Sequence, residues 1–194
     1  MMNYLAESFD LPILDWIASH IHCPALDWLM PKITLLGDAG IFWIICALIL
    51  MVIPKTRKAG FSMGLALLMG LVLCNLTLKP LVGRIRPYDY QWEHYSRTIE
   101  LLIEEEHDFS FPSGHTIASF EAAFALLLGN KKLGIPAMIL AVLIAFSRLY
   151  LYVHYPTDVI ASVILGIGLA ILATWIVGKL WDLVTAKMAQ KKNA

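Results

Sequence analysis

Long apolar stretches separated by short charged connections dominate this chain. Five stretches with at most one acidic or basic residue each cover residues 39–53, 59–78, 113–128, 133–147 and 159–178. Two of them reach the roughly 20 residues that an α-helix needs to cross a bilayer, and the shorter ones must borrow neighbouring residues. The pattern predicts an all-α fold, a polytopic membrane helical bundle with five spans.

Residues 1–36 follow a different pattern. Asp10, Asp15, Asp27 and Lys32 interrupt the apolar positions every few residues. This spacing favours amphipathic helices lying at the membrane interface, with a tilted sixth span as the alternative. A cleaved signal peptide is not expected, because a basic segment followed by a compact apolar core is missing from the first residues. We therefore expect about five to six transmembrane helices, the N-terminal interfacial or tilted helix included, in a single domain over residues 1–194.

Composition agrees with a lipid environment. Hydrophobic residues make up 59% of the chain and charged residues 15%, and the mean hydropathy is +0.69. Lysines and arginines balance the acids to a net charge of +0, so nucleic acid is not an expected partner. The three cysteines are odd in number, and Cys46 and Cys74 lie within predicted spans, so no disulfide framework is indicated.

Basic residues gather in alternate connections. They occupy residues 55–58, residues 131–132 and the tail 187–194, with hardly an acid among them. The positive-inside rule places these segments in the cytoplasm. We therefore predict a multi-pass protein of the cell membrane with a basic cytoplasmic C-terminal tail.

Three short motifs stand at the ends of the predicted spans, within residues 79–158. They are Lys79 with Arg86-Pro87 after six intervening residues, Pro112-Ser113-Gly114-His115, and Ser147-Arg148 followed by His154 and Asp158. In the five-span topology every one of these pieces falls on the extracytoplasmic face, whereas random scatter would divide them between both faces. The motifs therefore predict a single extracytoplasmic site.

The second and third motifs have the chemistry of an anion site with an activated histidine. Ser113 after Pro112 is a good N-cap, so the amides of Gly114 and His115 are free to bind an anion. Gly114 also lets an oxygen approach the main chain. Pro156 suits a first helical turn, which puts His154 just before the last span and Asp158 within reach of it. A carboxylate bonded to one ring nitrogen leaves the other free as a nucleophile.

The remaining motif residues supply charge. Arg86 and Arg148 offer planar forks that match phosphate oxygens, and Lys79 offers a point charge. Together they could stabilise a transferring phosphoryl group, and His115 is then left to protonate the leaving oxygen. Any one of these residues alone would more often be a span-end residue than a catalytic one, and it is the joint pattern that predicts phosphate chemistry.

At every fixed position and spacing, these motifs resemble the signature of the type 2 phosphatidic acid phosphatase superfamily, which also includes soluble vanadium haloperoxidases. The resemblance implies a helical core, no metal and no cofactor. It implies that His154 forms a phosphohistidine, that Asp158 orients it and that His115 is the general acid. It also implies a phosphate cradle made of Lys79, Arg86, Ser113, Gly114 and Arg148.

The resemblance implies an integral membrane lipid phosphatase, whose partners are its lipid phosphate substrate and the bilayer, with no obligate protein partner. Undecaprenyl diphosphate is the expected substrate, and phosphatidylglycerophosphate or phosphatidate is the alternative. Phosphotransfer to another lipid is a second enzymatic alternative, and an inactive membrane scaffold or transporter is the non-enzymatic one. The sequence does not distinguish among these substrates or fix the oligomeric state.

Other polar residues receive more modest interpretations. Glu121 lies inside the third apolar stretch, about 240° around a helix from His115, and we expect a structural hydrogen bond to another span, although its role stays open. Residues 104–106 are expected to be a solvated charge run. The aromatic residues of the loop 88–111 are expected to be interfacial anchors. The fragment His20, His22 and Cys23 has no second ligand pair nearby, so a metal site is not expected there.

Overall fold

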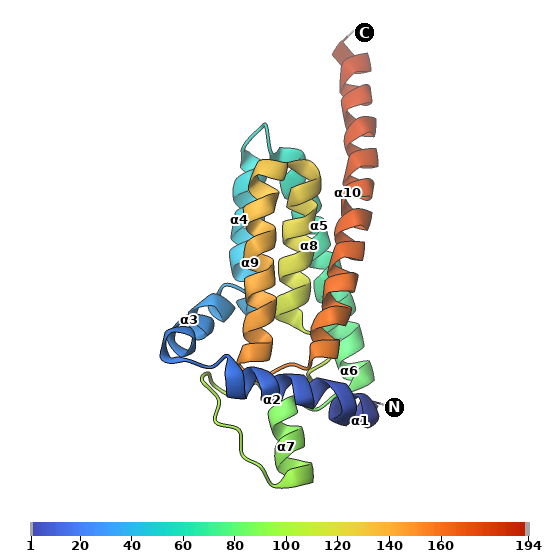
Figure 1. Ribbon diagram of the computed structural model, residues 1–194. Coiled ribbons are helices and arrows are strands. Elements are labelled where there is room, and N and C mark those ends of the chain that lie inside the picture. Colours follow the sequence, from blue (N-terminus) through green and yellow to red (C-terminus); the bar gives the residue numbers. More distant parts are fainter. Residues whose placement is uncertain (1, 193–194) are drawn as a thin grey trace.

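The structure is a computed structural model that describes residues 2–192, and this part of the chain is built of helices and connecting loops (Figure 1). The elements are α1 (Met2–Leu5), η1 (Ala6–Asp10), α2 (Leu11–His20), α3 (Pro24–Leu35), η2 (Asp38–Gly40), α4 (Ile41–Val52), α5 (Arg57–Gly70), η3 (Leu71–Leu78), α6 (Lys79–Val82), α7 (Pro87–Tyr95), α8 (Gly114–Gly129), α9 (Lys131–Tyr150) and α10 (Pro156–Lys192). The η1 and η3 segments are π-helical and η2 is a 3₁₀ turn.

Each of the five predicted apolar stretches is helical. Three helical runs are long and apolar enough to cross a membrane alone, namely Arg57–Tyr95, Lys131–Tyr150 and Pro156–Gln190. The bent pair Pro24–Leu35 and Asp38–Val52 raises the number to four, while Gly114–Gly129 is apolar but shorter. The predicted all-α membrane bundle is confirmed, with three to four such spans in the described part of the chain, close to the expected five to six. The difference arises because α4 and α8 have only 12 and 16 residues.

Helix α8 lies at the centre of the bundle and packs against α5, α9 and α10. Its inward positions are small, and Ala122, Ala123 and Ala125 are fully buried. Small side chains let neighbouring backbones approach closely, which is how helices pack in membranes, where the lipid is as apolar as the protein. The central position of α8 brings its N-terminus to the end of the bundle where α9 ends and α10 begins.

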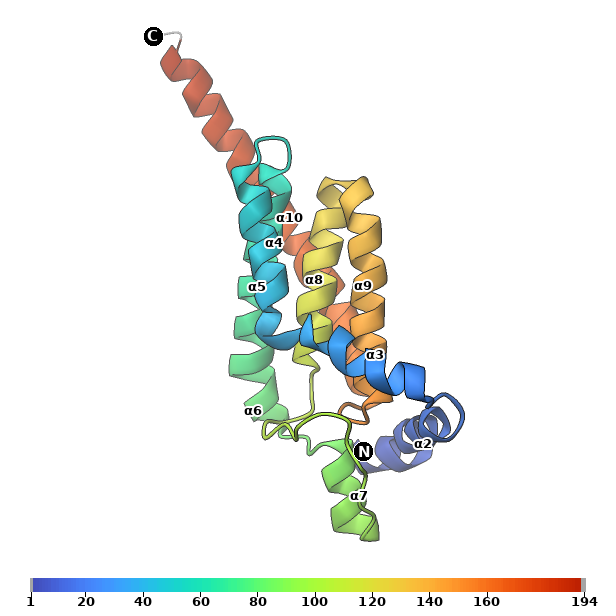
Figure 2. The same cartoon turned by 90° about the vertical axis from the view of Figure 1, so that its left-hand side faces the viewer.

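The N-terminal helices lie across this end of the bundle rather than along it (Figures 1 and 2). Leu14 and Ile17 of α2 are buried against the loop that follows α9, while Trp16 is 55% exposed. α3 is bent by 43° from the following helix. Residues 2–35 therefore cover the end of the bundle where the motif residues lie.

The chain reverses sharply after α6. Gly83 adopts a left-handed conformation with φ +59°, which ends the helix and is well suited to glycine. The following residues then cross the end of the bundle, so that Arg84 and Arg86 lie beneath the start of α10. The other end of α10 projects beyond the bundle (Figure 1). Residues 187–192 of the predicted basic tail continue this helix, and residues 193–194 lie outside the described residues.

Candidate active site

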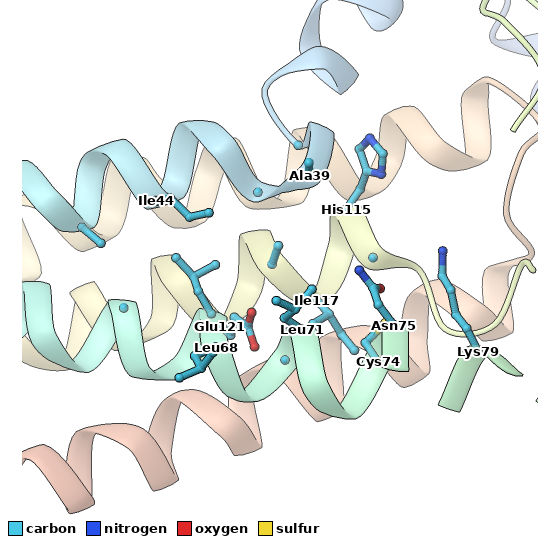
Figure 3. Close-up of a pocket in the computed structure, with 18 of the residues that line it drawn as sticks. Ala39, Ile44, Leu68, Leu71, Cys74, Asn75, Lys79, His115, Ile117 and Glu121 are labelled. Carbon is cyan, nitrogen blue, oxygen red and sulfur yellow. The ribbon is translucent and has the colours of Figure 1, made fainter. Parts of the chain in front are cut away.

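The three motifs meet at one end of the bundle, opposite the connections that follow α4 and α8 and carry basic residues (Figure 1). Lys79, Gly114, His115 and His154 line the same cavity, which has a volume of about 480 Å³ (Figure 3). The remaining motif residues, Arg86, Ser113, Arg148 and Asp158, are buried behind this lining. All eight residues that the sequence proposed thus belong to one locality.

The N-terminus of α8 opens toward this cavity. Ser113 is the N-cap, and its hydroxyl accepts hydrogen bonds from the amide of Thr116 at 3.4 Å and from the Thr116 hydroxyl at 3.0 Å. The amide of Ser113 donates to Ser162 at 2.8 Å, which ties the cap to α10. Gly114 begins the helix beside Asn75 of η3, so the first turn presents its amides at the cavity wall.

His154 is 1% exposed and lies in the short loop between α9 and α10. Its Nδ1 is 3.6 Å from Asp158 Oδ2, and its Nε2 is 3.4 Å from Nη1 of Arg86. Burial, reinforced by the positive charges of Arg86 and Arg148, lowers the pKa of His154 well below its usual value of 6.5. The ring is therefore neutral near pH 7, with one nitrogen toward a carboxylate and the other toward a cation.

Asp158 is held by residues that no motif contains. Its carboxylate accepts hydrogen bonds from the Ser110 hydroxyl, from the Tyr155 amide at 3.0 Å and from Arg84 at 2.5 Å. Arg84 also pairs with buried Asp10 of η1 at 2.7 Å. The sequence carried little signal for this network, because Asp10 lies 148 residues before its neighbour Asp158 and Arg84 stands outside the fixed spacing.

His115 is also paired with a carboxylate, that of Asp38, which lies in the break between α3 and α4. Asp38 Oδ1 is 2.6 Å from Nε2 of His115, and Nη1 of Arg148 is 3.4 Å from the same nitrogen. Arg148 is fixed from the other side by Thr34, to which it donates at 2.6 Å. Asp38 stands in no motif, and the break after α3 is what carries it to the site.

Two acids of the loop before α8 occupy the cationic cluster. Glu106 pairs with Arg148 and with Arg86, the latter at 2.6 Å, and Asp108 pairs with Lys79 and Arg86. Burial raises the pKa of both carboxyls, but the surrounding cations outweigh it and bring each pKa down to about 2. Both acids therefore stay ionised at every pH above about 3, and they hold the same cations that the sequence assigned to phosphate.

These contacts correct two expectations about the loop. Glu104 and Glu105 are solvent-exposed as expected of a charge run, but Glu106 is an ion-pair partner of two buried arginines. Trp92 and Tyr95 are exposed, which suits interfacial residues, but Tyr88 and Tyr90 are buried inside the protein. Buried Tyr88 donates to the carbonyl of Glu106 at 2.7 Å and so anchors the loop from within.

The expectation for Glu121 is also wrong. It is 1% exposed, and its Oε2 has no hydrogen-bond partner among the described residues, so it makes no structural bond to another span. Although it is far around the helix from His115, it lines the same cavity, because the cavity follows α8 inward. His22, where no metal site was expected, stacks on Tyr150, and its Nδ1 lies 3.2 Å from Asp27.

The sequence that forms this fold and this site matches a known protein family. Residues 57–182 match the PAP2 superfamily, and the chain belongs to it. The range runs from the start of α5 into α10 and includes all three motifs. It therefore agrees with the family that the motif spacing indicated.

Individual proteins with similar sequence or structure come from bacteria and archaea. The chain is 33% identical over 135 residues to the undecaprenyl-diphosphatase of Sulfolobus acidocaldarius, covering 69% of this chain and 63% of that protein. It is 31% identical over 152 residues to the bacitracin transport permease protein BcrC of Bacillus licheniformis, covering 78% and 73%. The crystal structure of a transmembrane PAP2-type phosphatidylglycerolphosphate phosphatase from Bacillus subtilis superposes with a TM-score of 0.69 at 29% identity, covering 90% and 87%.

Proposed function

We propose that this protein is an integral membrane lipid phosphatase that hydrolyses a phosphate or diphosphate monoester through a phosphohistidine intermediate, with undecaprenyl diphosphate as substrate. The observation that carries the proposal is a buried, neutral His154 set between Asp158 and a cluster of three cations. This cluster lies beside the polar end of an otherwise largely apolar cavity, which Lys79 and His154 line. Family membership and the name of the Sulfolobus relative support it.

In the first step the phosphate of the lipid enters the cluster of Lys79, Arg86 and Arg148. The amides at the start of α8 add hydrogen bonds to its oxygens. Nε2 of His154 attacks phosphorus while the bond from phosphorus to the leaving oxygen breaks. His115 gives its proton to that oxygen, and Asp158 stabilises the positive charge that develops on His154.

In the second step water attacks the phosphohistidine. His115, now deprotonated, takes a proton from the water as it attacks phosphorus, and the bond from phosphorus to His154 breaks. Inorganic phosphate leaves, and the histidines return to their starting state. No metal is required at any point, because the arginines and the lysine supply the positive charge that the transferring phosphoryl group needs.

The hydrocarbon part of the substrate would occupy the apolar part of the cavity. Ile44, Leu48, Leu68 and Leu71 line it and are also between 45% and 57% exposed on the outer surface of the helices. A lipid could therefore enter sideways from the bilayer, without its chain crossing water. This route favours a membrane lipid over a soluble phosphate ester.

We also propose an orientation in the membrane and a single-domain organisation. We place the site on the extracytoplasmic face and the C-terminus in the cytoplasm, and we treat residues 1–194 as one domain. The basic connections and the tail support this orientation.

Thiol labelling tests the orientation. In a cysteine-free background, Glu93→Cys should react with a membrane-impermeant thiol reagent on intact cells and Lys132→Cys should not. The reverse labelling would mean that the site faces the cytoplasm.

A phosphatidylglycerophosphate phosphatase is the second candidate, because the Bacillus subtilis structure superposes over 90% of this chain. Transfer of the phosphoryl group from His154 to another lipid is a further alternative, because it has the same first step as hydrolysis. A transporter is the non-enzymatic alternative suggested by the name of the Bacillus licheniformis relative. The clustering of the site's charges at one end of the bundle favours a reaction site over a pathway through the spans.

Phosphate release in the presence of EDTA tests the proposal. Detergent-purified protein is incubated with undecaprenyl diphosphate, phosphatidylglycerophosphate or phosphatidate, and inorganic phosphate is measured. We expect release without added metal, fastest with undecaprenyl diphosphate. Folded protein that releases no phosphate from any of the three lipids would contradict the proposed hydrolysis. A faster release from another of the three would make that lipid the substrate in place of undecaprenyl diphosphate.

The acidic loop provides a prediction about affinity. Glu106→Gln should strengthen inhibition by inorganic phosphate about threefold to tenfold and lower KM, because an ionised competitor for Arg86 and Arg148 is removed. Glu105→Gln, at an exposed neighbouring position, is the matched control and should leave both constants unchanged. Weaker inhibition in Glu106→Gln than in the control would mean that Glu106 orders the arginines rather than competing with the substrate.

A further inference from the structure

Glu121 is a carboxyl without a partner in the wall of an apolar cavity. It stands on α8 between the levels of Leu68 and Leu71, and it lines the cavity (Figure 3). No side chain in the described part of the protein donates a hydrogen bond to Oε2 or forms an ion pair with this residue. The mechanism above does not use it.

The helix opposite leaves room for this group. A Cβ atom added at Gly70 of α5 would collide with both carboxyl oxygens of Glu121, so this position is compatible only with glycine unless the carboxyl moves. The lack of a side chain at Gly70 on α5 therefore provides the space that the carboxyl of Glu121 on α8 occupies. This space belongs to the same cavity that holds His115 and His154 at its polar end.

The surroundings of Glu121 determine its chemistry. An ionised carboxylate buried among apolar side chains without a cation is costly, so this carboxyl carries its proton. A protonated carboxyl can donate one hydrogen bond through its O–H. Water can provide the acceptor in an empty cavity of this size, but a lipid chain that fills the cavity displaces that water. The lipid must then supply an acceptor, or the group is left unsatisfied.

The position of Glu121 selects which part of a lipid it meets. Six residues separate it from His115, which is about 9 Å along the axis of α8. The second phosphate of a diphosphate is joined to the first by one bridging oxygen, so it would lie beside the cationic cluster and not at this depth. An ester carbonyl is separated from phosphorus by the glycerol carbons and reaches further in. A prenyl chain presents only carbon there.

We propose that Glu121 is a specificity-determining residue that donates a hydrogen bond to an ester carbonyl of an acylglycerol phosphate. This inference rests on the proposed phosphatase function. It adds a preference among glycerol lipids within that function, because an ester carbonyl at this depth satisfies the carboxyl and an ether analogue without that carbonyl does not.

A matched pair of substrates isolates the carbonyl. Phosphate release from dioleoyl phosphatidate is compared with release from its dialkyl ether analogue, which has the same chains and head group but no carbonyl. For the wild-type protein we expect kcat/KM to be about fivefold to tenfold higher for the ester. Glu121→Gln, which keeps a hydrogen-bond donor, should retain this ratio. Glu121→Leu, which keeps the size and loses the donor, should bring the ratio close to one.

Hydrolysis of undecaprenyl diphosphate by the Glu121→Leu variant tests the role of Glu121 separately from the proposed phosphatase function. Glu121→Leu should hydrolyse this lipid at least as fast as the wild-type protein does, which also shows that the variant is folded and active. An ester-to-ether ratio that is the same in Glu121→Leu and wild type would overturn the role of Glu121 while leaving the phosphatase intact. Failure of the wild-type protein to release phosphate from any lipid would instead contradict the phosphatase function itself.

Discussion

His154→Ala is expected to reduce kcat/KM for lipid phosphate hydrolysis on the order of a thousandfold or more, with little change in folding. The residue supplies the proposed nucleophile, and a nucleophile cannot be replaced by the groups that merely bind the phosphate. What survives should be the slow attack of water on a phosphate held by Lys79, Arg86 and Arg148. The loss should therefore fall on kcat, while KM changes little.

The measurement is phosphate release in EDTA by purified protein, with the thermal unfolding midpoint recorded in the same detergent. His20→Ala is the matched control, because His20 is exposed, stacks on Trp16 and is hydrogen-bonded within α2. It should keep wild-type activity. If folded His154→Ala keeps a kcat/KM within about tenfold of that of the control, His154 is not the nucleophile.

Arg84→Met is expected to cause the largest loss of stability. Arg84 is the shared partner of Asp10 and Asp158, and both carboxylates are fully buried. Methionine keeps much of the side-chain volume but leaves the two carboxylates without their cation. Breaking a buried pair in this way typically costs about 3–5 kcal/mol, or roughly 6–20 °C in unfolding midpoint for a chain of this size.

Arg97→Met provides the comparison. Arg97 also pairs with an aspartate, Asp15, at 2.9 Å, but 49% of its side chain is exposed. Exposed pairs contribute about 0–1 kcal/mol, so its midpoint should move by no more than about 4 °C. Equal midpoints for the two variants would show that Arg84 does not hold the N-terminal helices and α10 together. Arg84→Lys should recover part of the difference, because it restores the charge but not the fork.

The local structure around the motif residues could be predicted, because it depends on short sequence patterns. Ser113 caps α8 as its place after Pro112 indicated, and Asp158 lies in the first turn of α10 within reach of His154. The five apolar stretches likewise became helices, since apolar composition over this length leaves a membrane chain few alternatives. Helix lengths were less predictable, and α4 ends after 12 residues.

The partners of these residues could not be predicted, because they come from segments that meet only in the folded chain. Asp38 reaches His115 through the break between α3 and α4, and Asp10 reaches Arg84 because the first helices cross the end of the bundle. Neither acid stands in a motif. Glu106 looked like one of three solvated acids, and its position between two arginines depends on how the loop returns to α8.

The most direct test of the account is detection of the phosphoryl group on His154 during turnover. Wild-type protein is mixed with lipid phosphate labelled in its terminal phosphorus, quenched with alkali within milliseconds and digested, and the modified residue is identified by mass spectrometry. We predict an alkali-stable, acid-labile phosphohistidine at His154 that decays as inorganic phosphate appears, and none in His154→Ala. Turnover at the normal rate with no label on His154 at any quench time would contradict a covalent mechanism.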